Sequence, residues 1–235
     1  MEGFRVKTGS IIGRAHSQHQ ANCQDKFALT TEKIGEQHYL IGVVADGCGS
    51  GKHSEIGAGL LANFLVRETA RQLAKGTDLT ELPNLLYPAA VCYLKRVLAG
   101  LQPGDPANLG QTVADYFLAT ALGFVIGPEK GIIFTAGDGL LAINETVNVL
   151  DKQNYPDYLG YHLLAGSEMP MTFEVTEFEV AELERLAIWT DGLCPEHLPQ
   201  TWGHQHPRGL QRQLNLLSRS GCLADDTTGI VIEKC

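Results

Sequence analysis

Three aspartates share one local pattern, in which an apolar stretch runs directly into an Asp-Gly pair. They are Asp46 in VVADGCGSG, Asp138 in IFTAGDGL and Asp191 in LAIWTDGL. Glycine lets the backbone turn sharply and approach other groups closely, so each pattern can present a carboxylate at the rim of a sheet. A single Asp-Gly is ordinary turn chemistry, but the recurrence points to a shared site.

Further acidic positions stand beside predicted strands, namely Asp25, which follows Gln24, and the pair Asp225-Asp226. Carboxylates gathered in one place repel one another, and a divalent cation is the usual means of keeping several of them ionised. Oxygen ligands select a hard ion such as Mg²⁺ or Mn²⁺, whereas zinc would need His or Cys ligands at spacings that this chain does not offer. Two hard ions can lower the pKa of a shared water and clamp a phosphoryl group during in-line attack. The acidic positions therefore predict a metal-dependent hydrolase.

The glycine-rich segment DGCGSGKHS, which begins at Asp46, matches other motifs only in part. A phosphate-binding loop of the form G-x-x-x-x-G-K-[ST] would need glycine at Asp46 and serine or threonine at His53. The dinucleotide pattern G-x-G-x-x-G meets Lys52 at its third glycine, and an EF-hand beginning at Asp46 would need glutamate at Gly57. None of these motifs fits.

The composition predicts one globular domain over residues 1–235. The chain is 44% hydrophobic and 19% charged, and no internal repeat or proline-rich linker divides it. A formal net charge of −9 argues against nucleic-acid and anionic membrane partners. No stretch approaches the ~18 uncharged apolar residues of a membrane span, and the first residues lack the pattern of a secretory signal. With scattered cysteines that read as free thiols, we expect a cytoplasmic protein.

Apolar periodicity places the acidic positions next to strand ends. Strands, a helical pair and further strands indicate an α+β protein whose helices cover a largely antiparallel sheet system. Helices are expected from Ser54, from near Thr80 and over 208–218, with a loop over 101–110. Strands are expected over 4–13, 26–31, 39–45, 117–126, 132–136, 140–150 with a turn near Asn144, 171–180 with a bulge, 186–189 and 229–232.

As an ordered set, these motifs resemble the metal-dependent serine/threonine protein phosphatases, the protein phosphatase 2C family, and especially a bacterial branch of it. The resemblance spans nearly the whole chain and rests on SIIGRAHSQHQANCQDKFAL, VVADGCGSGKHSEIGA, TALGFV with IIFTAGDG, LAIWTDGL and ADDTTGIVI. It implies a central antiparallel β-sandwich flanked by pairs of α-helices, in four layers α-β-β-α, with metals in a cleft at one end. It also implies hydrolysis of phosphoserine and phosphothreonine in proteins by a metal-activated water at a two-metal centre, with Mn²⁺ or Mg²⁺ as cofactor.

Carried over by position, the resemblance assigns Asp46 to both ions and the Gly47 carbonyl to the second ion. Asp191 and Asp225 would complete the shell of the first ion, and Asp25 would act mainly through metal-bound water. A weaker third site would use Asp138 together with Asp191. The expected catalytic residues are Asp25, Asp46 and Asp191, and the expected metal ligands are Asp46, Gly47, Asp138, Asp191 and Asp225. Asp226 is expected to be a capping or turn residue.

The chain departs from the family where the substrate phosphate is bound. The usual arginine, five residues before Asp25, corresponds here to Gln20. Arg14 or His16 is the candidate replacement, although a surface role suits Arg14 equally well. Gln24 stands where many members have glutamate, and the missing negative charge predicts weaker binding of the second metal.

A second departure concerns the proton donor. Cys48 stands where many eukaryotic members have a histidine thought to act as general acid. A buried thiol is a poor proton donor near neutrality, which leaves the role to metal-bound water or to a neighbour such as His53.

Two functions therefore stay open. The first is a bacterial phosphoprotein phosphatase in signal transduction, opposing a serine/threonine kinase. The alternative is a phosphatase-fold regulatory or phosphoprotein-binding module with little or no turnover. The segment 152–170 lies where the family often inserts a flap beside the site, and its tyrosines either contact substrate or pack a long connection. Those tyrosines are Tyr155, Tyr158 and Tyr161.

Overall fold

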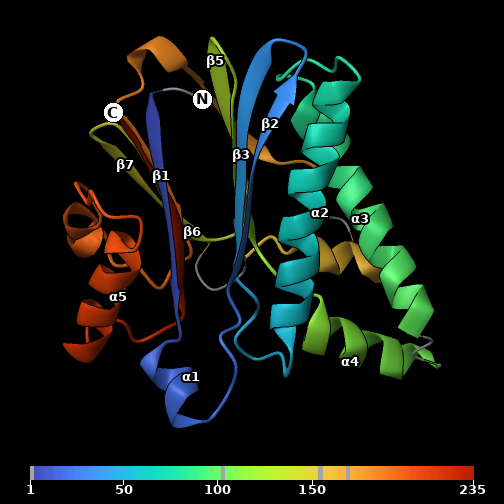
Figure 1. The fold of residues 1–235 in the computed structure, drawn as a ribbon. Coiled ribbons are helices and arrows are strands. Elements are labelled where there is room, and N and C mark those ends of the chain that lie inside the picture. The colour runs from blue at the N-terminus through green and yellow to red at the C-terminus, as the bar shows by residue number, and fades with distance from the viewer. Residues whose placement is uncertain (1–2, 102–103, 153–155, 168–169) are drawn as a thin grey trace.

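Two antiparallel sheets pack face to face, and helices cover both outer faces (Figure 1). The computed structural model describes residues 3–101, 104–152, 156–167 and 170–235. One five-stranded sheet, sheet A, has the strand order β1-β10-β9-β6-β7, and the other, sheet B, has the order β2-β3-β4-β5-β8. Every strand pair in both sheets is antiparallel. The predicted α+β sandwich of layers α-β-β-α is thereby confirmed.

The strands and helices have the following bounds. Sheet A contains β1 (Phe4–Ile11), β6 (Gly139–Ile143), β7 (Thr146–Leu150), β9 (Arg185–Trp189) and β10 (Thr227–Lys234). Sheet B contains β2 (Lys26–Ile34), β3 (Gln37–Ala45), β4 (Ala121–Ile126), β5 (Lys130–Ala136) and β8 (Glu174–Glu179). The α-helices are α1 (Arg14–Gln18), α2 (Ser54–Ala74), α3 (Leu82–Leu101), α4 (Pro106–Tyr116) and α5 (Gly209–Arg219). Short 3-10 helices are η1 (Leu159–Leu163), η2 (Val180–Glu182) and η3 (Pro195–Thr201).

Strand β3 shows why the central strands are apolar on both faces. Leu40 and Val44 belong to the cluster between the two sheets. Ile41 and Val43 point the other way, into the cluster beneath α2 and α3. Because successive side chains of a strand alternate between faces, a strand covered on both sides becomes a continuous apolar run.

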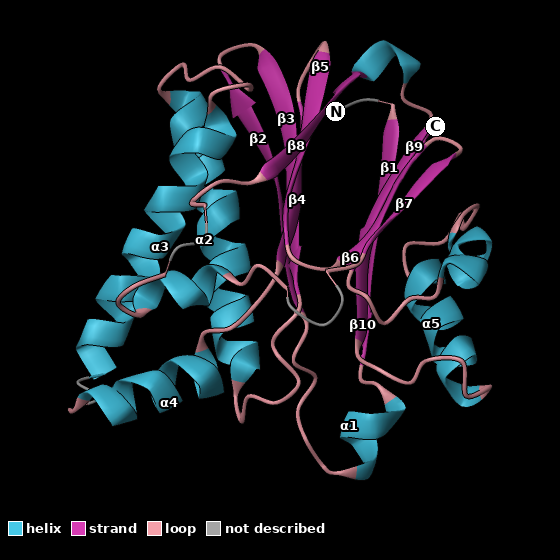
Figure 2. Ribbon diagram, turned by 180° about the vertical axis from the view of Figure 1, so that it is seen from behind, coloured by secondary structure: helices cyan, strands magenta, loops and turns pink. Residues whose placement is uncertain are grey.

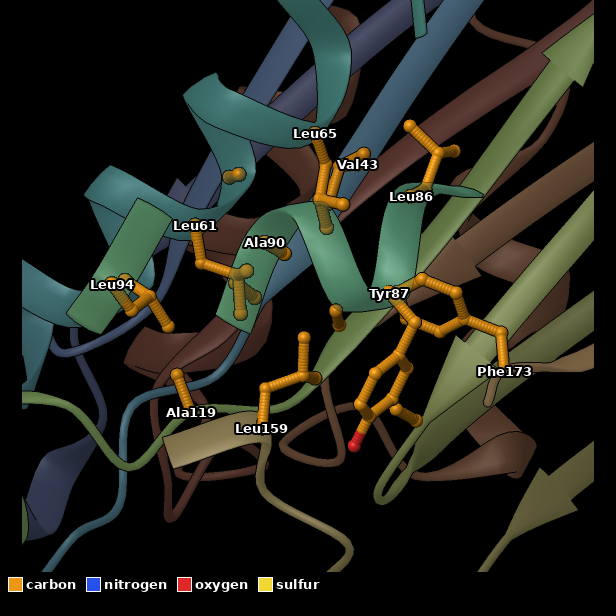
Figure 3. Close-up of a cluster of buried hydrophobic side chains, with 14 of the residues drawn as sticks. Val43, Leu61, Leu65, Leu86, Tyr87, Ala90, Leu94, Ala119, Leu159 and Phe173 are labelled. Carbon is orange, nitrogen blue, oxygen red and sulfur yellow. The ribbon is translucent and has the colours of Figure 1, made fainter. Parts of the chain in front are cut away.

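The larger outer layer covers sheet B with α2, α3 and α4 (Figure 2). Figure 3 shows Leu61 and Leu65 of α2 with Leu86 of α3 in the same buried cluster as Val43. The ring of Phe173 closes this cluster, at 4.9 Å from Tyr87 and 5.0 Å from Phe134 between ring centroids.

Sheet A is covered by α5 and η3. Leu210, Leu214 and Leu217 recur at helical spacing on one face of α5 and are buried against the sheet. Gly9 of β1 leaves room for this helix, since a Cβ there would lie 2.7 Å from Leu214 Cδ1. In the part of the chain that is described, no helix is both long enough and apolar enough to cross a membrane.

The expected elements differ from the observed ones in several places, and helix α1 was not expected at all. Part of the expected loop over 101–110 belongs to α4, because Asp105 caps this helix by accepting the Asn108 N–H at 2.9 Å. The strand expected from 117 begins only at Ala121. The bulge expected in 171–180 is absent, because Phe173 lies before β8, which pairs with β5 in unbroken register.

Candidate metal centre

The strand directions gather the predicted aspartates at the end of the sandwich that carries α1, opposite both termini (Figure 1). In sheet B, Lys26 pairs with Ala45, so Asp25 and Asp46 stand side by side just beyond the ladder. In sheet A, β9 ends and β10 begins at this same edge, which brings Asp191 to the segment before β10. Antiparallel pairing thus converts positions far apart in sequence into neighbours.

The two sheets meet at this end through Asp25. Its carboxylate is 2% exposed, and Oδ2 accepts a hydrogen bond from Thr190 Oγ1 at 2.7 Å. The side chains of Asp25 and Asp46 lie close enough to shift each other's pKa. Among the described residues, the other oxygen of Asp25, Oδ1, is buried and has no hydrogen-bond partner.

The carboxyls of this cluster perturb one another. Burial raises the pKa of Asp25 to about 7, and repulsion from Asp226 and Asp191 adds to the shift, while hydrogen bonds with Thr190 and Asp46 oppose it. Burial, followed by the charges of Asp25 and Asp191, holds the pKa of Asp46 well above its ordinary value. Partial desolvation and the neighbouring Asp225 raise the pKa of Asp191 to about 6, even though this residue reaches the surface.

This donor set fits a hard divalent cation. All its side-chain ligands are carboxylate oxygens, and they range from buried Asp25 through half-buried Asp46 to exposed Asp191 and Asp225. The unpartnered Oδ1 of Asp25 is the kind of buried polar atom that a bound ion or an ion's water shell would satisfy. Added positive charge would also relieve the repulsion that raises these pKa values.

The Gly47 carbonyl lies within the same edge. Gly47 forms a β-bridge with Ala119, and the bonds of that bridge run from Cys48 N–H to the Leu118 carbonyl at 2.9 Å and from Thr120 N–H to the Asp46 carbonyl at 2.8 Å. The carbonyl of Gly47 takes no part in these bonds. Thr120 also accepts the Asp46 N–H through Oγ1 at 3.0 Å, so Thr120 holds both the N–H and the carbonyl of Asp46.

Asp226 differs from Asp225 in that its carboxylate is buried and fully hydrogen-bonded. It is 2% exposed, and its Oδ1 accepts the Gly13 N–H at 2.7 Å. Its Oδ2 accepts the Gln24 N–H at 2.6 Å and lies 2.8 Å from His16 Nδ1. Close packing surrounds this segment, since a Cβ on Gly192 would lie 1.9 Å from the Asp226 carbonyl oxygen.

His16, Asp225 and Asp226 are, among the described residues, the one set of three potential ligands whose donor atoms all lie within 4.8 Å of one another. Both oxygens of Asp226 are already bonded, which makes it a structural tie between segments distant in sequence. Asp226 was predicted to be a capping or turn residue. It does accept backbone N–H groups, but these groups are more than 200 residues away in the sequence.

Comparison with known proteins bears on this arrangement. A family model described as Protein phosphatase 2C matches residues 12–223. The chain belongs to the protein phosphatase 2C family. No curated protein matches its sequence.

Several solved structures share the protein phosphatase 2C fold of this chain. A mutant of a bacterial serine phosphatase has a TM-score of 0.71 at 12% sequence identity, with 100% of both chains covered. Serine/threonine phosphatase Stp1 from Staphylococcus aureus has a TM-score of 0.64 at 13% identity, over 98% of this chain and 94% of that chain. PppA, described as a key regulatory component of T6SS in Pseudomonas aeruginosa, has a TM-score of 0.64 at 17% identity, over 100% and 99%. At these identities the likeness establishes the fold.

In this protein phosphatase 2C chain, the candidates for phosphate contact lie near α1. Arg14 is exposed, and only its backbone N–H is anchored, to the Leu223 carbonyl at 3.3 Å. His16 is half-buried against Asp226. Gln20, at the position of the family's arginine, is exposed and has a positive φ of 55°.

Asp138 lies apart from the buried pair, in the turn between β5 and β6. Its Oδ1 accepts the Lys152 N–H at 2.7 Å. Asp138 and Asp191 line one cavity of about 220 Å³, so the expected third-site pair does come together.

Sequence reasoning missed Thr190 and named Tyr158 only as a tyrosine of the expected flap. Thr190 precedes Asp191 in the TDG motif, but a threonine in a buried strand carries no signal of its own. Tyr158 is 8% exposed and lies near Cys48 and Asp46. Burial, then the charges of Cys48 and Asp46, raise the pKa of Tyr158.

The structure bears on the expected flap only in part. Tyr158 packs into the helix-side core, and the ring of Tyr161 lies 5.6 Å from it. Tyr155 lies outside the described residues. His53, the neighbour considered as a proton donor, is half-exposed, with Nδ1 3.6 Å from Glu55 Oε1.

Proposed function

We propose that this chain hydrolyses phosphoserine and phosphothreonine in proteins, with two Mg²⁺ or Mn²⁺ ions held by carboxylates at the end of the sandwich. The single observation that carries the proposal is the convergence of four aspartates from separate segments, two of which stand side by side just beyond the β2–β3 ladder. These aspartates are Asp25, Asp46, Asp191 and Asp225. Membership of the protein phosphatase 2C family supports the same reaction class.

The proposed ligands divide between the two ions. Asp46 would contact both ions, Asp191 and Asp225 would hold the first, and the Gly47 carbonyl would hold the second. Asp138 and Asp191 supply a third, weaker position. When bound, such ions lower the pKa of a coordinated water and neutralise phosphate charge.

Residues of the chain orient the reaction. Thr190 fixes Oδ2 of Asp25, which leaves Oδ1 free to accept a hydrogen bond from water at the centre. Asp25 is thereby a catalytic residue that aligns the attacking water. The Cys48 thiol is paired with the Ser50 hydroxyl at 3.2 Å, and we assign proton donation to the leaving group to its half-exposed neighbour His53.

Substrate attraction depends on the cations. The chain carries a formal net charge of −9, and like charges ~4 Å apart at an effective dielectric of ~20 cost about 4 kcal/mol. A phosphate dianion is therefore repelled by the metal-free cluster. We assign the protein side of the phosphate contact to His16 or Arg14, which flank the cluster on α1.

The biological setting follows from this chemistry. The substrates are phosphorylated proteins, and a serine/threonine kinase is the opposing enzyme in signal transduction. The free cysteines suit a reducing compartment such as the cytoplasm.

One observation favours the alternative of a phosphoprotein-binding module with little turnover. Gln24 is 4% exposed and neutral, and its Nε2 is already bonded to the Gly51 carbonyl at 2.7 Å. This residue cannot supply the negative charge that a glutamate would give the second ion.

Turnover of para-nitrophenyl phosphate and of a phosphoserine peptide with Mn²⁺ distinguishes the two functions. A hydrolase gives turnover that Asp46→Asn lowers by at least about a hundredfold, since that change removes the shared ligand. Equal, negligible rates in wild type and variant, together with phosphopeptide binding, would establish the module instead.

A further inference from the structure

The cavity of about 220 Å³ beside the centre has walls of mixed character. Asp138 and Asp191 form its acidic side, and Leu140, Val149, Leu193 and Pro195 give it apolar walls. Its volume lies below the roughly 300–1,000 Å³ typical of pockets for whole small molecules. The space therefore suits a single side chain that enters from a larger ligand.

The apolar wall comes from the register of sheet A. Leu140 of β6 pairs with Val149 of β7 on one side and with Trp189 of β9 on the other, so these side chains share the outer face. Leu140 and Trp189 are covered by the layer of α5 and η3 and are buried. Val149 lies on the edge strand beyond that layer and is 58% exposed. The outer face of sheet A is thus buried at β6 and β9 but exposed at β7, next to Asp138 and Asp191.

We propose that this cavity receives an apolar side chain of the phosphoprotein substrate, directly beside the phosphorylated residue. The inference rests on the proposed phosphatase function and adds a sequence preference to it. Asp191 belongs both to the proposed centre and to the cavity wall. Since one extended residue spans about 3.3–3.6 Å, a peptide whose phosphate lies at the centre brings its neighbouring residue to this opening.

The charges around the cavity select against acidic neighbours. Asp138 and Asp191 both line it, and among the described residues its lining includes no Lys, Arg or His. While the weaker third metal position is empty, a carboxylate inserted here would meet like charges and lose solvent. The preferred neighbour is accordingly leucine, isoleucine, valine or methionine, and the rejected neighbour is aspartate or glutamate.

The chain offers a matched pair of variants for a test. Val149 lines the cavity, and Val147 occupies the same face of β7 two residues earlier, 43% exposed and outside the cavity. Both side chains are exposed enough for replacement by serine to leave the fold intact. The assay measures kcat/KM of the Mn²⁺-loaded protein for phosphoserine peptides that differ only in a leucine, serine or aspartate immediately before or after the phosphoserine. Turnover of para-nitrophenyl phosphate, which has no neighbouring residue, reports on the centre alone.

We expect the wild type to prefer leucine over serine by about tenfold at one of the two flanking positions, the scale of one apolar group in a pocket. Val149→Ser should reduce that preference at least threefold and leave para-nitrophenyl phosphate turnover within twofold, while Val147→Ser retains the preference. The inference is overturned by a wild type without preference at either position, or by equal losses in both variants. A wild type that hydrolyses neither the peptides nor para-nitrophenyl phosphate would instead contradict the proposed function on which the inference rests.

Discussion

Thr190 donates its hydroxyl hydrogen to Asp25 across the two sheets, with 2.7 Å between Oγ1 and Oδ2. The same Oγ1 accepts the Thr228 N–H at 2.9 Å, so one hydroxyl connects the β10 backbone to the most deeply buried carboxylate of the candidate centre. Asp25 is thus held in one orientation by a residue that is fully buried. We regard Thr190 as a positioning residue.

Replacing Thr190 with valine removes this connection without changing the side-chain volume much. Because the buried Asp25 oxygen and the Thr228 N–H both lose a partner, unfolding free energy should fall by about 1–3 kcal/mol. Turnover should fall by roughly tenfold with little change in KM, since substrate contacts are untouched. Thr190→Ser keeps the hydroxyl and should restore both values, measured by chemical denaturation and steady-state kinetics. A higher KM with an unchanged kcat would instead assign Thr190 to substrate binding.

The stability of the metal-free protein should depend on pH through Asp25. Burial raises the pKa of Asp25 from its ordinary value of 3.8 to about 7, so the folded state holds this proton more strongly than the unfolded chain does. Stability from this group is full below about pH 3.8 and is lost as the pH rises through about 7. In excess EDTA the melting temperature should therefore fall between about pH 4 and pH 7 and level off above that range. Asp25→Asn should flatten that decline, whereas an unchanged slope in this variant would refute the assignment.

Asp46→Asn should separate stability from activity. The substitution removes one of two contacting carboxyls, which relieves repulsion and burial of charge, and the metal-free protein should gain on the order of 1–2 kcal/mol at pH 8. Added Mn²⁺ should stabilise the wild type and leave the variant's melting temperature nearly unchanged. Equal stabilisation of both proteins by Mn²⁺ would show that the ions bind elsewhere.

The neighbours Asp225 and Asp226 should respond in opposite ways to replacement by alanine. Asp226→Ala leaves the Gly13 and Gln24 N–H groups and His16 without their acceptor, which should cost at least about 3 kcal/mol of unfolding free energy. Asp225 has a side chain that is 63% exposed, so Asp225→Ala should change stability by no more than about 0.5 kcal/mol. Its effect should appear in Mn²⁺ affinity, measured by calorimetric titration. If Asp225→Ala lowered stability and Asp226→Ala lowered only the Mn²⁺ affinity, the structural and metal-binding roles assigned to the two residues would be wrong.

Much of this site could be predicted because Asp-Gly pairs at strand ends are local features. The positions of Asp46, Asp138 and Asp191 followed from short apolar runs and the glycine after each aspartate. The contact between Asp25 and Asp46 depends on the register of β2 with β3, which no local pattern states. The hydrogen bond between Thr190 and Asp25 could not be predicted for the same reason, because it joins residues far apart in the sequence.

The errors in the predicted fold also have physical causes. Helix α4 lies in a stretch rich in proline and glycine, and its signal is a single aspartate cap at Asp105. The expected bulge arose from counting Phe173 as a strand residue, although its ring packs against Tyr87 ahead of β8. A buried aromatic side chain beside a strand has the same apolar signature as one within it.

The most direct measurement is a crystal structure of the Mn²⁺-loaded protein with anomalous scattering data. The account predicts two anomalous peaks in contact with Asp46, one of which also touches Asp191 and Asp225. Peaks confined to His16 and Asp226, or no peak within coordination distance of Asp46, would contradict it.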